Sequence, residues 1–266
     1  MPDPFESVLW KIGRAKVHYE SAKNAFKALV DADPYKLTGD FDRNRRILRV
    51  RVATVGDIPQ DFCLAIGDAA HNARSALDHL MFALARPATQ QQARCVSFPI
   101  ENRMGDFRNT ISNARRCPIP GVPRGVKTVL ERLQPYHRRK RPDAAILWKL
   151  KKLDDWDKHR MLSTSIASLA GFEAAFKLLK LPGTTAVLDK RVFPNRILKP
   201  RTIIARLQFS TTMLGAEVQV TPKLEIQPVF DSRAPGEIER LNALDVIRRA
   251  IKFIERDVIP SFRPFV

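Results

Sequence analysis

The first thirty residues place apolar side chains at every third or fourth position. This series starts at Phe5 and runs to about Val30, where Asp33-Pro34 follows it. A second series of the same kind extends from Phe62 to Leu84, just before a proline. Each series predicts a long amphipathic helix with one buried face.

Shorter helices are expected further along the chain, separated by breaks that contain proline. The last one opens at Ser232 and Pro235 and carries an apolar stripe from Ile238 to Val258. The others are expected over residues 105–115, 123–133 and 144–162.

Alternation of apolar and polar residues indicates short, half-buried strands. Residues 47–54 alternate leucine or valine with arginine, and a similar alternation covers 202–209 and 217–230. The patterns together predict an α+β protein that is mainly an α-helical bundle with a small antiparallel β-sheet region. We expect a helical bundle over 1–165 with one short strand near 47–54, an antiparallel sheet region over 166–232, and a C-terminal helix over 233–266 that packs back on the bundle.

The chain is strongly basic, and the excess charge is regional. It has 46 Lys and Arg against 28 Asp and Glu, a formal net charge of +18. Residues 101–200 hold 22 of the basic and 9 of the acidic residues, whereas the parts on either side are close to balance. A local excess of this size favours a polyanionic partner, of which nucleic acid is the commonest. A basic surface that contacts only solvent is the simpler alternative.

The expected location of the protein rests on the absence of three features: membrane-spanning segments, a signal peptide and paired cysteines. No segment reaches the roughly 18 uncharged apolar residues of a membrane-spanning helix. The N-terminus has no basic start followed by an apolar core, so no signal peptide is expected. Cys63, Cys95 and Cys117 form no C-x-x-C pair, which predicts reduced thiols and no cysteine-based zinc site. We expect a cytoplasmic protein with no membrane partner.

The second helix carries a dense set of polar residues among core-forming ones. Arg74 and Asp78 are four residues apart and so are neighbours on one face, and His71 lies one turn before Arg74 on the same stripe. Asn72, Ser75 and His79 form a second stripe by the same arithmetic. Burying so many polar groups is costly unless they pair or have a function. The structural alternative is an Arg74–Asp78 ion pair with histidines satisfied by neighbouring helices.

A second cluster, Asp154-Asp155-Trp156-Asp157-Lys158-His159-Arg160, ends the helix expected at 144–162. Asp155 can orient His159, and Trp156 can stack on Arg160, because both pairs are four residues apart. In the alternative interpretation, Lys158, His159 and Arg160 only complement the helix dipole.

Two chemistries are open to these groups. A metal site would need His18, His71, His79 and His159 to converge in a bundle, and the Glu-x-x-His pairs of ferritin-type sites are absent. Metal-independent cleavage of RNA needs only a histidine as general acid or base and an arginine at the phosphate, which the second helix provides. We therefore expect RNA as the substrate and no metal, and a metal-binding helical bundle is the second alternative.

The segment Arg74-Ser-Ala-Leu-Asp-His79 fits the R-x4-H pattern of HEPN nucleases, α-helical RNases of bacterial toxin and defence systems, and the chain resembles them. Together with Asp157-Lys158-His159-Arg160, the motif from His71 to His79 also resembles a bacterial protein family of unassigned activity, over residues 5–165. The resemblance implies a helical bundle, often dimeric, that cuts RNA without metal, and an antitoxin as a further partner. HEPN nucleases usually have Asn, Asp or His after the arginine, where this chain has Ser75.

The resulting hypothesis is a metal-independent endoribonuclease of HEPN type. His79 would be the general acid or base, Arg74 the phosphate ligand, and Asp78 the group that orients Arg74. Asn72 and Ser75 would assist them. Residues five apart on a helix point about 140° from one another, so Arg74 and His79 share a pocket only with a bend or a second protomer. The residues expected to support the site are His71, Asp157, His159 and Arg160.

The competing hypothesis is a nucleic-acid-binding protein without chemistry, which would contact phosphates through its basic middle part. No phosphate-binding loop, dinucleotide fingerprint, H-E-x-x-H or G-x-S-x-G motif occurs, so no cofactor is expected. The residues expected to bind nucleic acid are Arg138, Arg139, Lys140, Arg141, Lys149 and Lys152.

Overall fold

The computed structural model describes residues 3–42, 44–85, 96–112, 122–138, 140–159, 166–179, 187–210 and 217–266. The chain forms two compact units, and neither is continuous in sequence. The helical unit comprises Met1–Asn24, Gln60–Ser163 and Phe230–Val266, and the strand unit comprises Ala25–Pro59 and Thr164–Val229.

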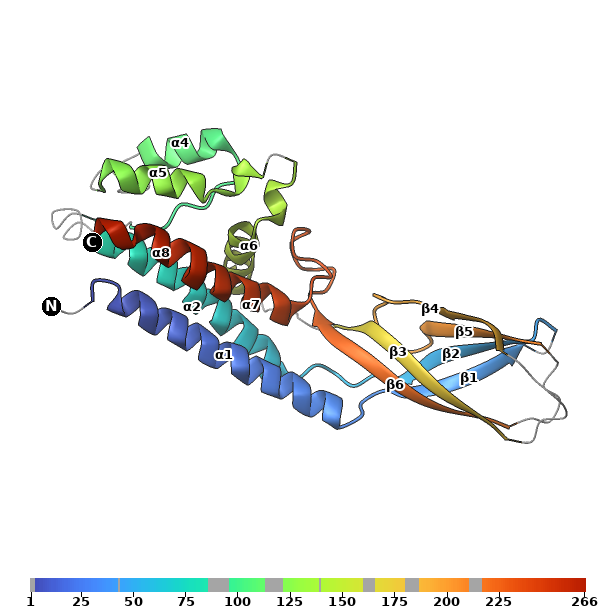
Figure 1. Ribbon diagram of the computed structural model, residues 1–266. Coiled ribbons are helices and arrows are strands. Elements are labelled where there is room, and N and C mark those ends of the chain that lie inside the picture. The colour runs from blue at the N-terminus through green and yellow to red at the C-terminus, as the bar shows by residue number, and fades with distance from the viewer. Residues whose placement is uncertain are drawn as a thin grey trace. The chain divides into compact units, whose positions relative to one another are not determined.

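The helical unit contains two long helices and several short ones (Figure 1). Its helices are α1 (Glu6–Asp31, whose last turns belong to the strand unit), α2 (Gln60–Leu84), α4 (Met104–Ser112), α5 (Arg124–Arg132), α6 (Ile146–His159), α7 (Ala243–Phe253) and α8 (Ile259–Phe262). Short 3₁₀ turns are η2 (Pro135–His137), η3 (Pro142–Ala144) and η5 (Arg263–Phe265), and η4 (Ile254–Val258) is a π-helical turn.

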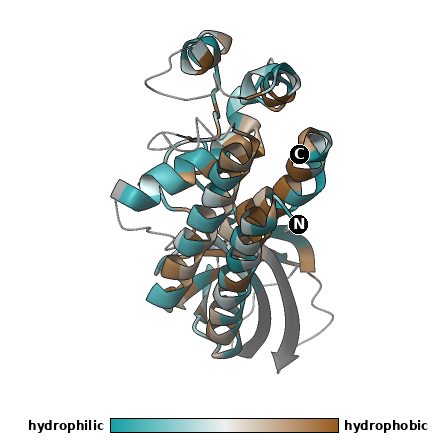
Figure 2. Ribbon diagram, turned by 90° about the vertical axis from the view of Figure 1, so that its left-hand side faces the viewer, coloured by the Kyte–Doolittle hydropathy of each residue, from teal (hydrophilic) through white to brown (hydrophobic). Residues whose placement is uncertain are grey.

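Helix α2 is the central element of the helical unit because both α6 and α7 pack against it. Small residues at Ala65, Ala69, Ala73 and Ala76 are buried on α2, which allows neighbouring helices to approach closely. Figure 2 shows hydrophobic and hydrophilic segments interspersed along the long helices, as expected for amphipathic helices. The apolar face of α2 therefore fixes the helices that carry the candidate site.

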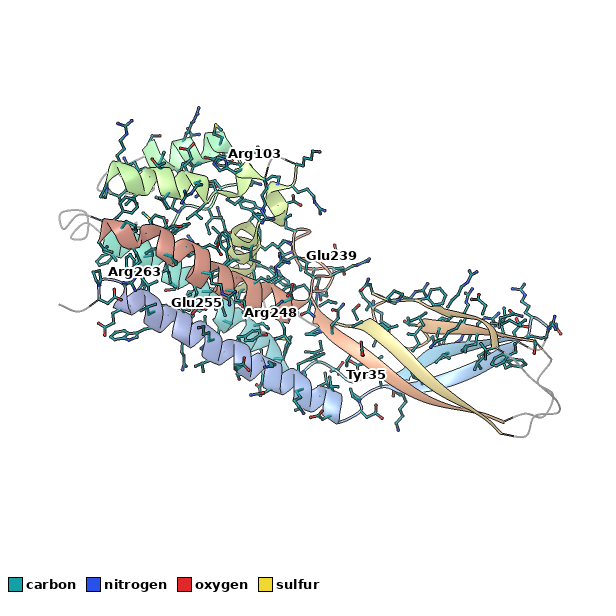
Figure 3. All side chains as sticks on the ribbon, in the orientation of Figure 1. Tyr35, Arg103, Glu239, Arg248, Glu255 and Arg263 are labelled. Atoms are coloured by element: carbon teal, nitrogen blue, oxygen red, sulfur yellow. The ribbon has the colours of Figure 1, made fainter. Side chains whose placement is uncertain are left out.

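Arg263 and Glu255 of the C-terminal turns, both labelled in Figure 3, pair with the segment before α1 and with α1 itself. Both terminal nitrogens of Arg263 contact the Asp3 carboxylate at 2.9 Å, and Glu255 pairs with Lys16. The π-helical turn just before α8 has a local cause in Pro260, which lacks an N–H and crowds the carbonyl four residues earlier.

The strand unit consists of two antiparallel sheets. The four-stranded sheet has the order β1-β2-β5-β4, and β3 pairs with β6 in the second sheet. Leu48, Val50 and Val52 point into the core, and Arg49 and Arg51 lie on the opposite face. The strands are β1 (Lys36–Asp42), β2 (Ile47–Thr54), β3 (Ile166–Leu179), β4 (Val187–Val192), β5 (Ile203–Phe209) and β6 (Glu217–Val229).

The structure confirms the α+β class, with small antiparallel sheets and a C-terminal helix. The boundaries differ in two places. Residues 25–59, which contain the strand expected inside the helical bundle, belong to the strand unit because β2 pairs with β1 and β5. The C-terminal helix α7 starts at Ala243, since the Asn242 side chain accepts a hydrogen bond from the backbone of Asp245 and caps the helix there.

The expected C-terminal ends of two helices cannot be compared with the structure. The ends expected at 113–115 and 160–162 lie outside the described residues. Within the described part of the chain, no helix has the length and apolar character needed to cross a membrane.

Candidate functional site

Figure 1 shows α6 beside α2, and these two helices pack against each other. The candidate site is a set of polar side chains on these two helices. Spacings of three and four residues place the polar side chains of α2 on one stripe of that helix. The same spacings place the polar side chains of α6 on one stripe. We call these residues the polar seam. Its members are His71, Arg74 and Asp78 of α2 and Asp154, Asp157 and Lys158 of α6.

Asp154 is the buried centre of the polar seam. Its side chain is only 2% exposed, and its two oxygens have different partners. Oδ1 lies 3.1 Å from Nδ1 of His71, and Oδ2 accepts a 2.6 Å hydrogen bond from the Lys158 ammonium. The side chains of His71 and Lys158 remain 51% and 48% exposed, respectively. One buried carboxylate thus holds an imidazole and an ammonium that both reach solvent.

This arrangement prepares His71 for proton transfer. When the neutral imidazole donates its Nδ1–H to Asp154, its other nitrogen, Nε2, becomes the acceptor. A carboxylate behind a histidine also stabilises the imidazolium that forms when Nε2 takes a proton. Lys158 adds a positive charge beside the imidazole. Together, the two side chains can exchange a proton with a substrate and stabilise a negatively charged oxygen on it.

Arg74 is anchored within the protein through Nη2, whereas its buried Nη1 has no hydrogen-bond partner among the described residues. Its side chain is 14% exposed, and Nη2 donates to the carbonyl oxygen of Phe98 at 2.9 Å and contacts Oδ1 of Asp78 at 3.2 Å. The backbone N–H of Phe98 donates to the same Asp78 oxygen at 2.8 Å. Asp78 therefore contacts Arg74, and the pair fixes the segment around the buried Phe98 to α2.

Burial raises the pKa of Asp78 despite the nearby Arg74 guanidinium, which lowers it. Asp154 and Lys158 also act on this carboxyl with opposite signs, so Asp78 lies within electrostatic range of the α6 side of the polar seam. The Asp78 carboxyl therefore interacts with charges on both α2 and α6.

Asp157 is the half-buried carboxylate of the polar seam on α6. Burial raises its pKa, and the carboxylates of Asp154 and Asp68 raise it further, whereas His71 lowers it. Asp68 also lies 3.6 Å from Nδ1 of His18 on α1. The carboxylates of Asp154 and Asp157 thus both interact with the imidazole of His71.

His79 lies away from Arg74, as the helical geometry requires. It lines a pocket of about 470 Å³ together with Ser7, Asp78, Phe82 and Val96. Burial lowers the pKa of His79, and so does the positive charge of Lys11, so this imidazole is neutral at neutral pH. Asp78 alone belongs to both the pocket and the polar seam.

Of the second stripe of α2, which carries Asn72, Ser75 and His79, only His79 lines the pocket. The Asn72 amide donates to the backbone carbonyl of Asp68 at 2.9 Å, one turn earlier on the same helix. Ser75 is half-buried. Neither residue joins His79 in the lining of the pocket.

The basic residues fall on more than one surface. Lys149 is half-buried, and its pKa is lowered by burial and by the positive charges of Arg249, Arg141 and Arg138. Lys140 is exposed in the same loop as Arg141. Lys152 instead lies 4.8 Å from the centre of the Trp148 ring, and Lys149 is half a helical circumference away from Lys158.

Several predicted site residues cannot be compared. Arg139 and Arg160 lie outside the described residues, as does the side chain of His159 at the end of α6. Trp156, expected to stack on Arg160, packs edge-on against Phe230 with ring centroids 6.4 Å apart. Within the described ranges, no three His, Cys, Asp or Glu side chains are grouped closely enough to hold a metal ion.

Sequence reasoning did not select Asp154 and Lys158 as candidates. Their four-residue spacing was a usable signal, but nothing local showed that Asp154 is buried or that it meets His71, which is 83 residues away. No protein-family model, curated protein or solved structure matches this chain.

Proposed function

We propose that the protein is a metal-independent endoribonuclease whose reacting groups are His71 and Lys158 rather than Arg74 and His79. One observation carries this proposal: the buried Asp154 carboxylate holds the imidazole and the ammonium side by side while both remain about half exposed. The carboxylate thereby orients both groups on a surface that a substrate can reach.

The reaction would proceed by attack within the RNA chain. Nε2 of His71 takes the proton of a ribose 2′-hydroxyl, and the resulting oxygen attacks the adjacent phosphorus. Lys158 stabilises the negative charge that grows on the phosphate oxygens. The bond to the 5′-oxygen breaks as Asp157 protonates that oxygen, because its raised pKa lets it keep a proton to higher pH than an exposed carboxyl does. The products are a 2′,3′-cyclic phosphate and a 5′-hydroxyl.

The kinship with HEPN nucleases is part of the proposal. It is supported by the R-x4-H sequence on α2 and by the predominance of helices in the unit that carries it. In this chain Arg74 would stabilise the bundle through Asp78 and Phe98, and the chemistry would lie one turn earlier, at His71.

The test is cleavage of an end-labelled RNA of mixed sequence by the purified protein in EDTA. We expect the parent to produce 2′,3′-cyclic phosphate ends and His71→Ala to lose about 10²-fold or more of the rate. His137→Ala is the matched control, because His137 lies in the same unit on η2 and packs against Tyr136 instead of the polar seam.

Two results would contradict the proposal. One is an unchanged cleavage rate in a folded His71→Ala variant. The other is cleavage that stops in EDTA and returns with a divalent cation. Circular dichroism spectra of all three proteins establish that the comparison is made between folded chains.

A second candidate function is nucleic-acid binding without cleavage, and the surroundings of Lys149 favour it. Three arginines act on this half-buried lysine, from the loop between η2 and α6 and from α7. Cations brought together against their own repulsion are typical of a phosphate-binding surface. RNA that binds with a steep salt dependence but is not cut would support this function.

A further inference from the structure

The pocket beside the polar seam combines an exposed aromatic ring with polar side chains. It encloses about 470 Å³, which is within the usual range for sites that bind small organic molecules. It is lined by Ser7 of α1, by Asp78, His79 and Phe82 of α2, and by Val96. All five belong to the helical unit.

The apolar part of the pocket is suited to a flat ring. Phe82 is 44% exposed, although it lines a concave site. An aromatic side chain left exposed in the lining of a pocket is typical of sites where nucleobases stack.

The polar part of the pocket offers a fixed acceptor. The Asp78 carboxylate accepts a hydrogen bond from the backbone N–H of Phe98 at Oδ1, the same oxygen that contacts the Arg74 guanidinium. Its other oxygen, Oδ2, makes no hydrogen bond to a described residue. Arg74 and Phe98 therefore hold the carboxylate in place and leave one acceptor for a ligand. His79, which is neutral, can donate one hydrogen bond and accept another.

We propose that this pocket binds a nucleobase with an exocyclic amino group, next to the phosphate that His71 and Lys158 would handle. A carboxylate oxygen accepts readily from the N4 amino group of cytosine. Uracil has a carbonyl oxygen at the same position, which Asp78 would repel. The inference rests on RNA as the substrate, and Asp78 links the two sites because it belongs to both.

Titration calorimetry with cytidine and uridine 5′-monophosphates tests the proposal without any cleavage step. The two nucleotides share their sugar and phosphate and differ at the base edge that Asp78 would contact. We expect cytidine monophosphate to bind at least about tenfold more tightly. Phe82→Ala should weaken its binding by about tenfold, because the stacking surface is lost. Val17→Ala, an exposed apolar residue elsewhere on α1, is the matched control.

A second variant tests the polar contact itself. Asp78→Asn keeps an oxygen for Arg74 and Phe98 and replaces the other oxygen with an amino group. We expect this variant to lose the preference for cytidine monophosphate or to reverse it, because an amide nitrogen donates to the uracil carbonyl.

The outcomes separate the pocket from the cleavage function. Equal affinity for the two nucleotides, or binding of neither, overturns the pocket assignment even in a protein that cuts RNA. A clear preference for cytidine monophosphate that is lost in Phe82→Ala supports the pocket. If the same protein cuts no RNA, the assignment of the pocket stands and the proposed nuclease activity falls.

Discussion

Nδ1 of His71 lies 3.1 Å from Oδ1 of Asp154, and the second oxygen of the same carboxylate is 2.6 Å from the Lys158 ammonium. The carboxylate is buried, and both of its partners face solvent. A histidine oriented in this way has one nitrogen committed to the protein and the other available for a substrate.

Replacing the central carboxylate should impair chemistry more than binding. In Asp154→Asn the amide keeps the shape of the side chain, but it no longer balances an imidazolium or the Lys158 charge. We expect the cleavage rate to fall by about 10²- to 10⁴-fold with RNA affinity nearly unchanged. Single-turnover kinetics and filter binding measure the two quantities.

Asp155→Asn is the matched control for this variant, because Asp155 is the next residue on α6 and is exposed. Equal loss of activity in both variants would mean that activity depends on the total negative charge of α6. It would also mean that Asp154 does not act through His71.

Removing Arg74 should mainly destabilise the fold. In Arg74→Met the buried Phe98 carbonyl loses its donor, and Asp78 keeps its charge without a nearby cation. We expect the free energy of unfolding to fall by about 2–4 kcal/mol. Urea denaturation followed by circular dichroism measures this change.

Arg14→Met provides the comparison, since Arg14 is exposed on α1, and its effect should stay within about 0.5 kcal/mol. A fully stable Arg74→Met protein with weakened RNA binding would instead assign Arg74 to the phosphate, as the R-x4-H resemblance implies.

The pKa of His79 predicts a pH dependence of stability. Its folded-state pKa lies below the ordinary value of 6.5, so the folded chain binds this proton less readily than the unfolded chain does. The stability that results is fully present above pH 6.5 and is lost as the pH falls through the folded-state pKa. The parent should therefore lose more stability than His79→Gln between about pH 7.5 and about pH 5.

Urea midpoints of the two proteins at both pH values check this expectation. Parallel losses in the parent and in His79→Gln would show that other groups cause the pH dependence. His137→Gln, measured in the same way, separates the effect of this site from that of losing any histidine.

The cluster around Lys149 predicts a change in the salt dependence of RNA binding. If Lys149 and Arg249 contact phosphates, Lys149→Gln and Arg249→Gln should each reduce the slope of log affinity against log salt by about 1. Lys23→Gln, on the exposed side of α1, should leave the slope unchanged. Fluorescence anisotropy at several salt concentrations gives these slopes, and an unchanged slope in Lys149→Gln would remove the cluster from the binding surface.

The parts of the fold that the sequence predicted well are those with strong local periodicity. The two long helices were expected near their observed limits, and β5 and β6 were expected from alternation. In contrast, β1 and β4 were not identified, because most of their side chains are exposed on both faces and no alternation results. The start of α7 was placed too early because the apolar stripe continues through turns that are not helical.

For the candidate site, the sequence by itself determined the stripe that carries His71, Arg74 and Asp78, because residues three and four apart on a helix must share a face. It also determined the positive charge of the chain. Only the tertiary structure decided which histidine meets a carboxylate, since His71 and Asp154 are brought together from 83 residues apart by the packing of α6 on α2. Helix periodicity specifies the face of each helix, whereas the partner of that face depends on how the apolar surfaces of several helices fit together.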